Sequence, residues 1–185
     1  LFRSIKDFIV TSEFEVFNNL HFKKNESKKI KKLQRQLSHK KIGSNNRNKA
    51  RIKLAKIYKR ITDKKQYYLH KISNSLIDEN KVICMEDLNV KGMMKNKHLS
   101  KAVASQKFYE FRAKLQAKCS ADRIELRIVD TWYPSSKTCH ECGSLKKDLK
   151  LSDRIYRCEH CGAVIDRDFN AALNLRDAKV YEIAV

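Results

Sequence analysis

Short apolar runs alternate with longer segments of helical periodicity along this chain, which predicts a mixed α/β fold. The first two runs surround Phe8 and Val16 and are joined by the polar turn 11–13, which is typical of two short strands. β-branched and apolar residues predict two further strands, at 81–86 and at 126–129. A short first strand would leave an incomplete edge on the sheet, and such an edge favours pairing with another chain.

Helical spacing of apolar residues marks four segments of the sequence. The first two lie within 26–79 and are separated by a Gly-Ser-Asn-Asn loop at 43–46, which predicts a helical hairpin. The other two cover 99–121 and 168–178. The predicted order is therefore two strands, a hairpin, a strand, a helix, a strand, a cysteine-rich segment and a last helix.

Composition adds a strong basic charge to this picture. The chain has 185 residues, 42% of them hydrophobic, and its 41 Lys and Arg against 21 Asp and Glu give a formal net charge of +20. Such a surplus predicts a polyanionic partner, which we expect to be nucleic acid. A membrane is not expected, because no apolar run approaches the roughly 18–20 residues of a spanning helix. No signal segment opens the chain, so we expect a cytoplasmic protein, and nothing indicates a small-molecule substrate.

The basic residues are concentrated in residues 26–65, which hold sixteen Lys and Arg and only two acids. These like charges would repel one another without a counter-charge, so the hairpin is interpreted as a nucleic-acid surface; the alternative is a solvated, self-supporting helical pair. Trp132 and Tyr133 could stack on bases, although aromatic residues at a strand end also serve as packing. The expected nucleic-acid contacts are Lys28, Lys29, Lys32, Arg35, Lys40, Lys41, Arg47, Arg51 and Lys137.

Four of the six cysteines form two CxxC pairs, Cys139 with Cys142 and Cys158 with Cys161. A two-residue spacer lets both sulfurs of a pair reach one ion, and the glycine after each pair accepts the positive φ that closes the turn. Four thiolates predict a closed, structural zinc site. The alternatives are an iron–sulfur site or two unrelated pairs.

Four acidic residues stand at the ends of apolar runs. Glu86 and Asp87 follow the strand predicted at 81–86, and Asp166 and Asp168 begin the last predicted helix. Acids from separate elements could converge on divalent ions, as in two-metal nucleases. The alternative for Asp166 or Asp168 is an N-cap or helix-dipole role, and the alternative for Glu86 and Asp87 is a rim charge or a loop hydrogen bond.

Five stretches of this sequence together resemble one known family. They are IKDF at 5–8, the Lys-rich block, MEDLNVKGM at 85–93, YPSSKTCHECG at 133–143 and CGAVIDRDFNAALN at 161–174. The chain resembles the transposon-encoded TnpB/OrfB family of RNA-guided DNA nucleases, relatives of the compact type V CRISPR effectors. The resemblance implies an α/β fold, an RNase H-like (RuvC) domain with an inserted basic helical hairpin and an inserted four-cysteine zinc ribbon. It also implies Mg²⁺ as a cofactor, and DNA and a guide RNA as partners.

The resemblance further implies domain boundaries. The RuvC-like domain would comprise 1–130 and 163–185, with its first strand incomplete. The basic helical insertion would cover 26–80, and the zinc ribbon 131–162.

The family's nuclease centre uses three acids. The resemblance implies that two of them correspond to Glu86 and Asp168 of this chain, and Asp166 is a less favoured alternative to Asp168. The first aspartate would fall on Phe2, so it is absent. Asp7 is a poor substitute, because an odd spacing along a strand places its side chain on the opposite face. We therefore expect binding of DNA with cleavage reduced by orders of magnitude. The alternatives are a non-catalytic nucleic-acid-binding regulator and a decayed fragment.

Overall fold

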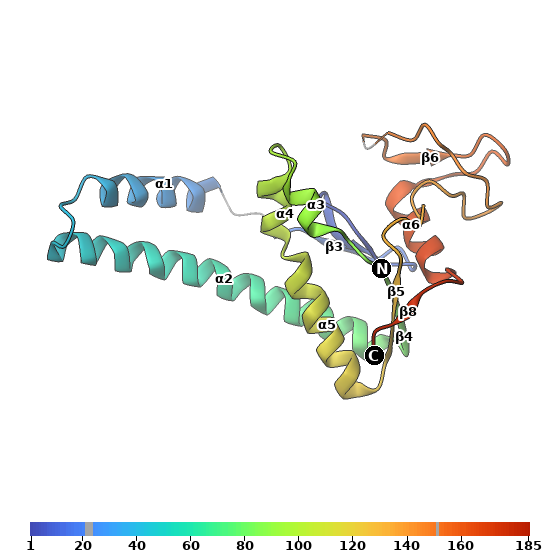
Figure 1. The fold of residues 1–185 in the computed structure, drawn as a ribbon, viewed down its shortest axis with the longest axis horizontal. Helices are drawn as coiled ribbons and strands as arrows, with labels where there is room; N and C mark the ends of the chain where they lie inside the picture. Colours follow the sequence, from blue (N-terminus) through green and yellow to red (C-terminus); the bar gives the residue numbers. More distant parts are fainter. Residues whose placement is uncertain (21–23, 151) are drawn as a thin grey trace. The chain divides into compact units, whose positions relative to one another are not determined.

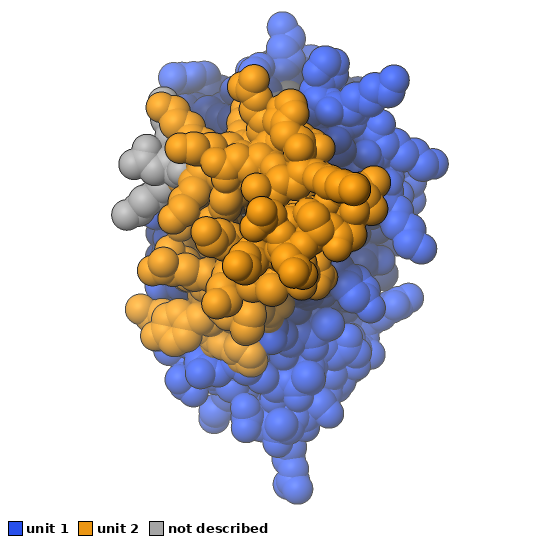
Figure 2. Space-filling model, turned by 90° about the vertical axis from the view of Figure 1, so that its left-hand side faces the viewer, with its two compact units in different colours: residues 1–19, 72–185 blue, residues 20–71 orange. Residues whose placement is uncertain are grey.

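Two units make up the chain, and both are coloured in Figure 2. The α/β unit comprises residues 1–19 and 72–185, and the hairpin unit comprises residues 20–71. The computed structural model describes residues 1–20, 24–150 and 152–185. The boundary at Lys71 lies inside helix α2 (Asn45–Glu79), whereas the sequence predicted the end of the insertion at residue 80.

Three strands form an antiparallel sheet at the start of the α/β unit: β1 (Phe2–Arg3), β2 (Asp7–Val10) and β3 (Val16–Asn18). The polar turn between β2 and β3 was predicted, and the Thr11 hydroxyl stabilises it by accepting a hydrogen bond from the backbone N–H of Glu15 at 3.0 Å. The two predicted strands are therefore confirmed, and β1 is an additional one.

The second sheet contains the parallel pair β4 (Val82–Glu86) and β5 (Glu125–Val129), with the short β8 (Glu182–Ile183) antiparallel to β5. Both parallel strands were predicted, and their register ends with Glu86 opposite Val129. Strand β1 lies beside β4, because the backbone N–H of Arg3 donates to Glu86 Oε1 at 3.0 Å. Among the described strands β1 pairs only with β2, so the expected sheet edge lies at β1, and the contact with β4 is not part of a strand ladder.

Helices α5 (Phe108–Asp122) and α6 (Arg167–Arg176) lie on opposite sides of β4 and β5 (Figure 1). On the α5 side, the fully buried Phe111 meets the ring of Phe8 edge-on, with 5.3 Å between the ring centroids. On the α6 side, Val129 packs with Leu175. Apolar packing therefore joins α5 to β2 of the first sheet and α6 to β5 of the second.

One expected helix is divided in two. The segment 99–121 contains α4 (Ser100–Gln106) and α5, which are separated by Lys107 in the left-handed conformation with φ of 57°. This break starts a new helix at Phe108, whose ring stacks on Phe8 with a centroid distance of 5.9 Å. Burial of an aromatic side chain outweighs the roughly 1–2 kcal/mol cost of one left-handed residue. A short helix, α3 (Val90–Met94), was not predicted.

The hairpin unit contains α1 (Lys24–Ser38) and most of α2, as the periodicity predicted. Arg47 fixes the connection, since its guanidinium donates to the carbonyls of Leu37 and Lys40, both at 3.0 Å. These carbonyls lie at the C-terminal end of α1 and would otherwise need solvent as a partner. Among the described ranges, no helix is both long enough and apolar enough to cross a membrane.

The aromatic contact between Phe8 and α5 leads to a stability prediction. We expect Phe111→Ala to lower the free energy of unfolding by about 3–5 kcal/mol, because it leaves a cavity beneath the sheet. Tyr109→Ala is the matched control, since Tyr109 lies on the same helix and is 75% exposed. Urea unfolding followed by circular dichroism measures both variants, and similar losses for the two would contradict this description of the core.

Candidate functional site

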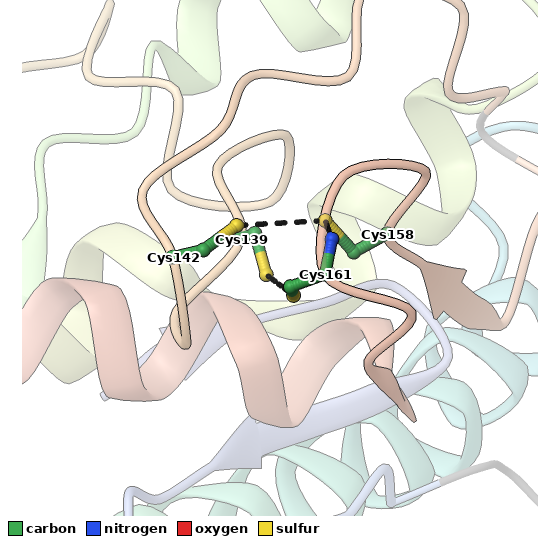
Figure 3. A group of neighbouring side chains, drawn as sticks. All are labelled: Cys139, Cys142, Cys158 and Cys161. Carbon is green, nitrogen blue, oxygen red and sulfur yellow. Dashed lines mark hydrogen bonds between the residues drawn. The ribbon is translucent and has the colours of Figure 1, made fainter.

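Four cysteine side chains converge on one point (Figure 3). The Sγ atoms of Cys139 and Cys161 lie 3.7 Å apart. Those of Cys142 and Cys158 lie 3.6 Å apart, and all four sulfurs are within 4.8 Å of one another. A tetrahedron of thiolates at about 2.3 Å from zinc has sulfur–sulfur edges of about 3.8 Å. The arrangement therefore fits one zinc ion, and in the described part of the chain no other group of three or more potential metal ligands lies this close together.

Two tight turns bring these sulfurs together. Each turn ends at the glycine that the sequence singled out, with φ of +74° at Gly143 and +75° at Gly162. The N–H of Gly143 donates to the carbonyl of Cys139 at 2.8 Å, and that of Gly162 to Cys158 at 3.1 Å. A side chain at either glycine would be strained at this φ, which confirms the reason for glycine in both turns.

A serine hydroxyl adjoins two of the sulfurs. Ser144 Oγ lies 3.2 Å from Cys142 Sγ and 3.1 Å from Cys158 Sγ. This contact, helped by backbone N–H groups, lowers the pKa of Cys142 to about 7 and that of Cys158 to about 5. The thiolate is the form that binds metal, so this contact favours metal binding at these two sulfurs, whereas burial raises the pKa of Cys139 and the neighbouring thiols raise that of Cys161. The spacing of the cysteines gave no indication of this residue.

The second cysteine pair lies in the turn of a hairpin formed by β6 (Ile155–Arg157) and β7 (Val164–Asp166). Tyr156 is fully buried beneath the cluster, and its hydroxyl donates toward the Lys137 carbonyl at 3.1 Å. Because β7 pairs with β6, the hairpin that carries the second cysteine pair continues to Asp166, past residue 162, where the sequence predicted the end of the ribbon.

Two asparagines of α6 hold the first cysteine turn against the helix. Asn170 is fully buried; its amide donates to the Thr138 carbonyl at 2.8 Å and accepts from the N–H of His140 at 3.0 Å. Asn174, one turn later, donates to the carbonyls of Ser135 at 2.8 Å and Thr138 at 2.7 Å. The sequence analysis missed this role, although the i, i+4 spacing of two asparagines next to the apolar residues 171–173 and 175 was a signal.

Glu86 ends strand β4, where its carboxylate accepts the Arg3 N–H. Burial raises the pKa of Glu86 above its ordinary value, and the positive charge of Arg3 opposes the increase. The negative charge of Asp168 adds to the increase in the pKa of Glu86, so the two carboxyl groups influence each other. The two acids that the sequence selected therefore lie on β4 and α6, two elements that contact each other.

The two aspartates at the beginning of α6 have different roles. Asp166 is the N-cap, and its carboxylate accepts from the N–H groups of Asp168 at 2.9 Å and Phe169 at 3.0 Å. The N-cap alternative is therefore confirmed for Asp166. Asp168 is 6% exposed and pairs with Arg167 at 3.0 Å. The backbone N–H of Arg167 donates to the Arg154 carbonyl at 2.8 Å, which ties this turn to the zinc unit.

The remaining candidates near the acids have other partners. Asp87 forms an ion pair with Arg112, and its carbonyl accepts from the Thr131 hydroxyl at 2.7 Å. Asp7 pairs with Lys6 at 3.0 Å on strand β2, which is separated from β4 by β1. Phe2, onto which the resemblance would place the family's first aspartate, packs against the apolar cluster around Leu175. No third carboxylate from the described residues completes a metal-binding group with Glu86 and Asp168.

The hairpin unit contains a groove of about 730 Å³ with a basic lining. Its lining includes five cationic side chains and one histidine: Lys32, Arg35, His39, Lys40, Lys49 and Lys53. Three of the predicted contacts, Lys32, Arg35 and Lys40, are among them. Arg47 and Arg51 do not line it, because Arg47 binds the loop carbonyls and Arg51 donates to Asn48 Oδ1 at 3.0 Å. Lys28, Lys29, Lys41 and Lys137 are exposed but lie outside this groove.

Comparison with known proteins gives two family matches. Residues 4–97 match the OrfB_IS605 family, described as "Probable transposase", and residues 108–175 match the "Cas12f1-like, TNB domain" family. A Streptomyces pristinaespiralis protein named "Putative RNA-guided DNA endonuclease" is 40% identical over 92% of this chain and 42% of its own length. TnpB-like protein L79 of Acanthamoeba polyphaga mimivirus is 35% identical over 82% of this chain and 30% of its own.

A solved structure shares the fold. It is a chain of the cryo-EM structure of the Cas12f1–sgRNA–target DNA complex, with a TM-score of 0.60 and 19% identity over 90% of this chain and 46% of that one. This chain therefore spans less than half the length of these relatives. The OrfB_IS605 match covers half of the sequence, and the chain belongs to that family of transposon proteins, the TnpB/OrfB family that its motifs indicated.

Proposed function

We propose that this chain is the nucleic-acid-binding part of a TnpB-type protein, which holds DNA and a guide RNA and is stabilised by one zinc ion. The basic groove of the hairpin unit is the observation that carries the proposal. By their names, the relatives include RNA-guided DNA endonucleases, and the structural neighbour is a complex with guide RNA and target DNA. Such partners place the protein inside the cell, on nucleic acid.

The α/β unit supports an RNase H-like (RuvC) interpretation. Its antiparallel strands β1–β3 lie beside the parallel pair β4 and β5, and the two acids come from β4 and α6. In this interpretation, 1–130 and the end of the chain form the RuvC-like domain. The hairpin and the zinc ribbon are insertions, and the ribbon extends from 131 to 166.

The groove suits a phosphate backbone more than a single small anion. Lys32 and Arg35 follow one helix, and Lys49 and Lys53 follow the other, so the charges extend along the groove. Cations spaced in this way contact successive phosphates and release their counterions, which gives affinity without sequence preference. Sequence selection would then belong to base pairing with the guide RNA.

Zinc is the ion that we propose for the four cysteines. The sulfur–sulfur distances of 3.6 and 3.7 Å fit tetrahedral thiolates, and Ser144 favours the charged form of two of them. A site closed by four protein ligands has no position for substrate, so its role is structural. We propose that it holds the β6–β7 hairpin and the start of α6 in place.

The acid centre does not fit a pair of Mg²⁺ ions. Among the described residues no group of three potential ligands includes Glu86 and Asp168, Asp168 is already paired with Arg167, and Phe2, where the family resemblance puts the first aspartate, has an apolar ring that packs in the core. A two-metal site requires more carboxylate charge than this. We therefore propose binding without cleavage, an arrangement that also suits a non-catalytic regulator.

The zinc proposal predicts one zinc ion per purified chain, measured by chelator competition and elemental analysis. Removal of the ion should lower the unfolding temperature, because the cluster has too little apolar packing to hold its turns alone. Cys158→Ala should abolish stoichiometric zinc, whereas Cys84→Ala should retain it, since Cys84 lies on β4 outside the cluster. Iron with visible absorption would instead indicate an iron–sulfur site.

The groove proposal predicts how affinity depends on salt. We expect the double variant Lys49→Ala/Lys53→Ala to weaken binding of all nucleic-acid sequences alike and to reduce the salt slope by about 0.9 for each lost phosphate contact. Lys101→Ala/Lys179→Ala is the control, because it removes the same charge from exposed positions of the α/β unit. Fluorescence anisotropy at several salt concentrations measures both, and an equal effect would mean that net charge alone governs binding.

The acid centre predicts no Mg²⁺-dependent cleavage of single-stranded DNA by this chain. Phe2→Asp should create Mn²⁺ binding that can be measured by water-proton relaxation. Adding Glu86→Ala to this variant should abolish the new Mn²⁺ binding. Phe2→Asn is the matched control, because it loses the same packing without adding charge. Cleavage by the unmodified chain that disappears in Glu86→Ala would overturn our interpretation of Phe2.

A further inference from the structure

Trp132 presents its indole to solvent immediately after strand β5. It is the only tryptophan of the chain and is 85% exposed. Tryptophan is usually well buried, because its ring gains much from leaving water. Keeping this ring in water therefore costs free energy, and a ligand that covers the ring would recover it.

The turn that carries this indole is fixed by hydrogen bonds. The N–H of Trp132 donates to Asp130 Oδ1 at 2.7 Å, and the N–H of Tyr133 donates to the Asp130 carbonyl at 3.1 Å. The hydroxyl of Thr131 donates to the Asp87 carbonyl at 2.7 Å, which ties the turn to the end of β4. The backbone that carries the ring is thus positioned before any ligand arrives.

The neighbouring aromatic residue has the opposite orientation. Tyr133 packs against the cluster of Val129, Leu175 and Ala178, and its hydroxyl donates to the Asn174 carbonyl at 3.3 Å. The two adjacent rings are therefore divided between core and solvent. Core packing explains the aromatic side chain at position 133, but it does not explain the one at position 132.

The position of the turn points to nucleic acid. Asp87, which holds Thr131, directly follows Glu86, and the N–H of Asp87 donates to the Val129 carbonyl at 2.8 Å. The indole thus emerges from the carboxyl edge of β4 and β5, where ligands of α/β folds bind. Lys137 is exposed later in the same connection, and the chain as a whole has a net charge of +20.

We propose that Trp132 is a stacking platform for an unpaired base of single-stranded nucleic acid that passes the Glu86–Asp168 edge. This inference rests on the proposed function. It adds that the nucleic acid bound at this edge is single-stranded. An exposed indole can stack on any base, because every base has a π-face, whereas the bases of an intact duplex are already stacked on one another. A platform of this kind holds a strand without reading its sequence.

The single tryptophan makes the test direct, because all indole fluorescence of the chain comes from this site. The probe is an oligothymidylate, compared with an abasic oligonucleotide of equal length and charge. We expect oligothymidylate to quench the emission at saturation and the abasic strand to leave it unchanged. Trp132→Ala should weaken oligothymidylate binding by about 5- to 150-fold without changing the salt slope, since no phosphate contact is lost.

Two further variants complete the design. Trp132→Phe should retain most of the affinity, and Tyr109→Ala, which removes another exposed ring, should leave it unchanged. Binding by the unmodified chain with no quenching, or unchanged affinity in Trp132→Ala, would overturn the stacking role and favour a protein surface at this position. Absence of any nucleic-acid binding by the unmodified chain would overturn the proposed function as well, so the two failures are distinct.

Discussion

Helix α6 is held between the sheet and the cysteine cluster, and the arrangement of the α/β unit depends on this docking. Ala171, Ala172 and Leu175 are fully buried, while Asn170 and Asn174 fasten the first cysteine turn. A buried amide that loses its partner costs about 1–3 kcal/mol. Separating α6 from the sheet or from the cysteine turn therefore costs free energy. Both contacts together fix the position of Asp168 in the first turn of the helix.

Electrostatics divides the molecule into two chemical environments. The hairpin unit carries lysines and arginines along a groove, where solvent screens their charges. Near the end of β4, burial raises the pKa of Glu86, the positive charge of Arg3 opposes the increase, and the negative charge of Asp168 adds to it. Clustered acids of this kind are typical of functional centres. Here Arg167 pairs with Asp168, and Phe2 packs in the apolar cluster around Leu175.

The edge formed by β4 and β5 combines several features that the chain separates by many residues. Glu86 and Asp87 come from one strand, and the turn that carries Trp132 follows the other. Parallel pairing with a matched register is what places them at the same end. The strand pairing and the hydrogen bond from Thr131 to Asp87 hold this edge together without an ion.

The sequence by itself determined the hairpin, the strands β2 to β5 and the four cysteines, because these follow from local periodicity, charge and spacing. The glycines of the cysteine turns were also determined, since a positive φ is a local requirement. Only the tertiary structure divided the helix at Lys107, joined β7 to β6 and separated Asp166, a cap, from Asp168, a neighbour of Glu86. It also decided that Tyr133 is packed and Trp132 exposed. These outcomes depend on contacts between residues far apart in the chain, and a local pattern carries no information about such contacts.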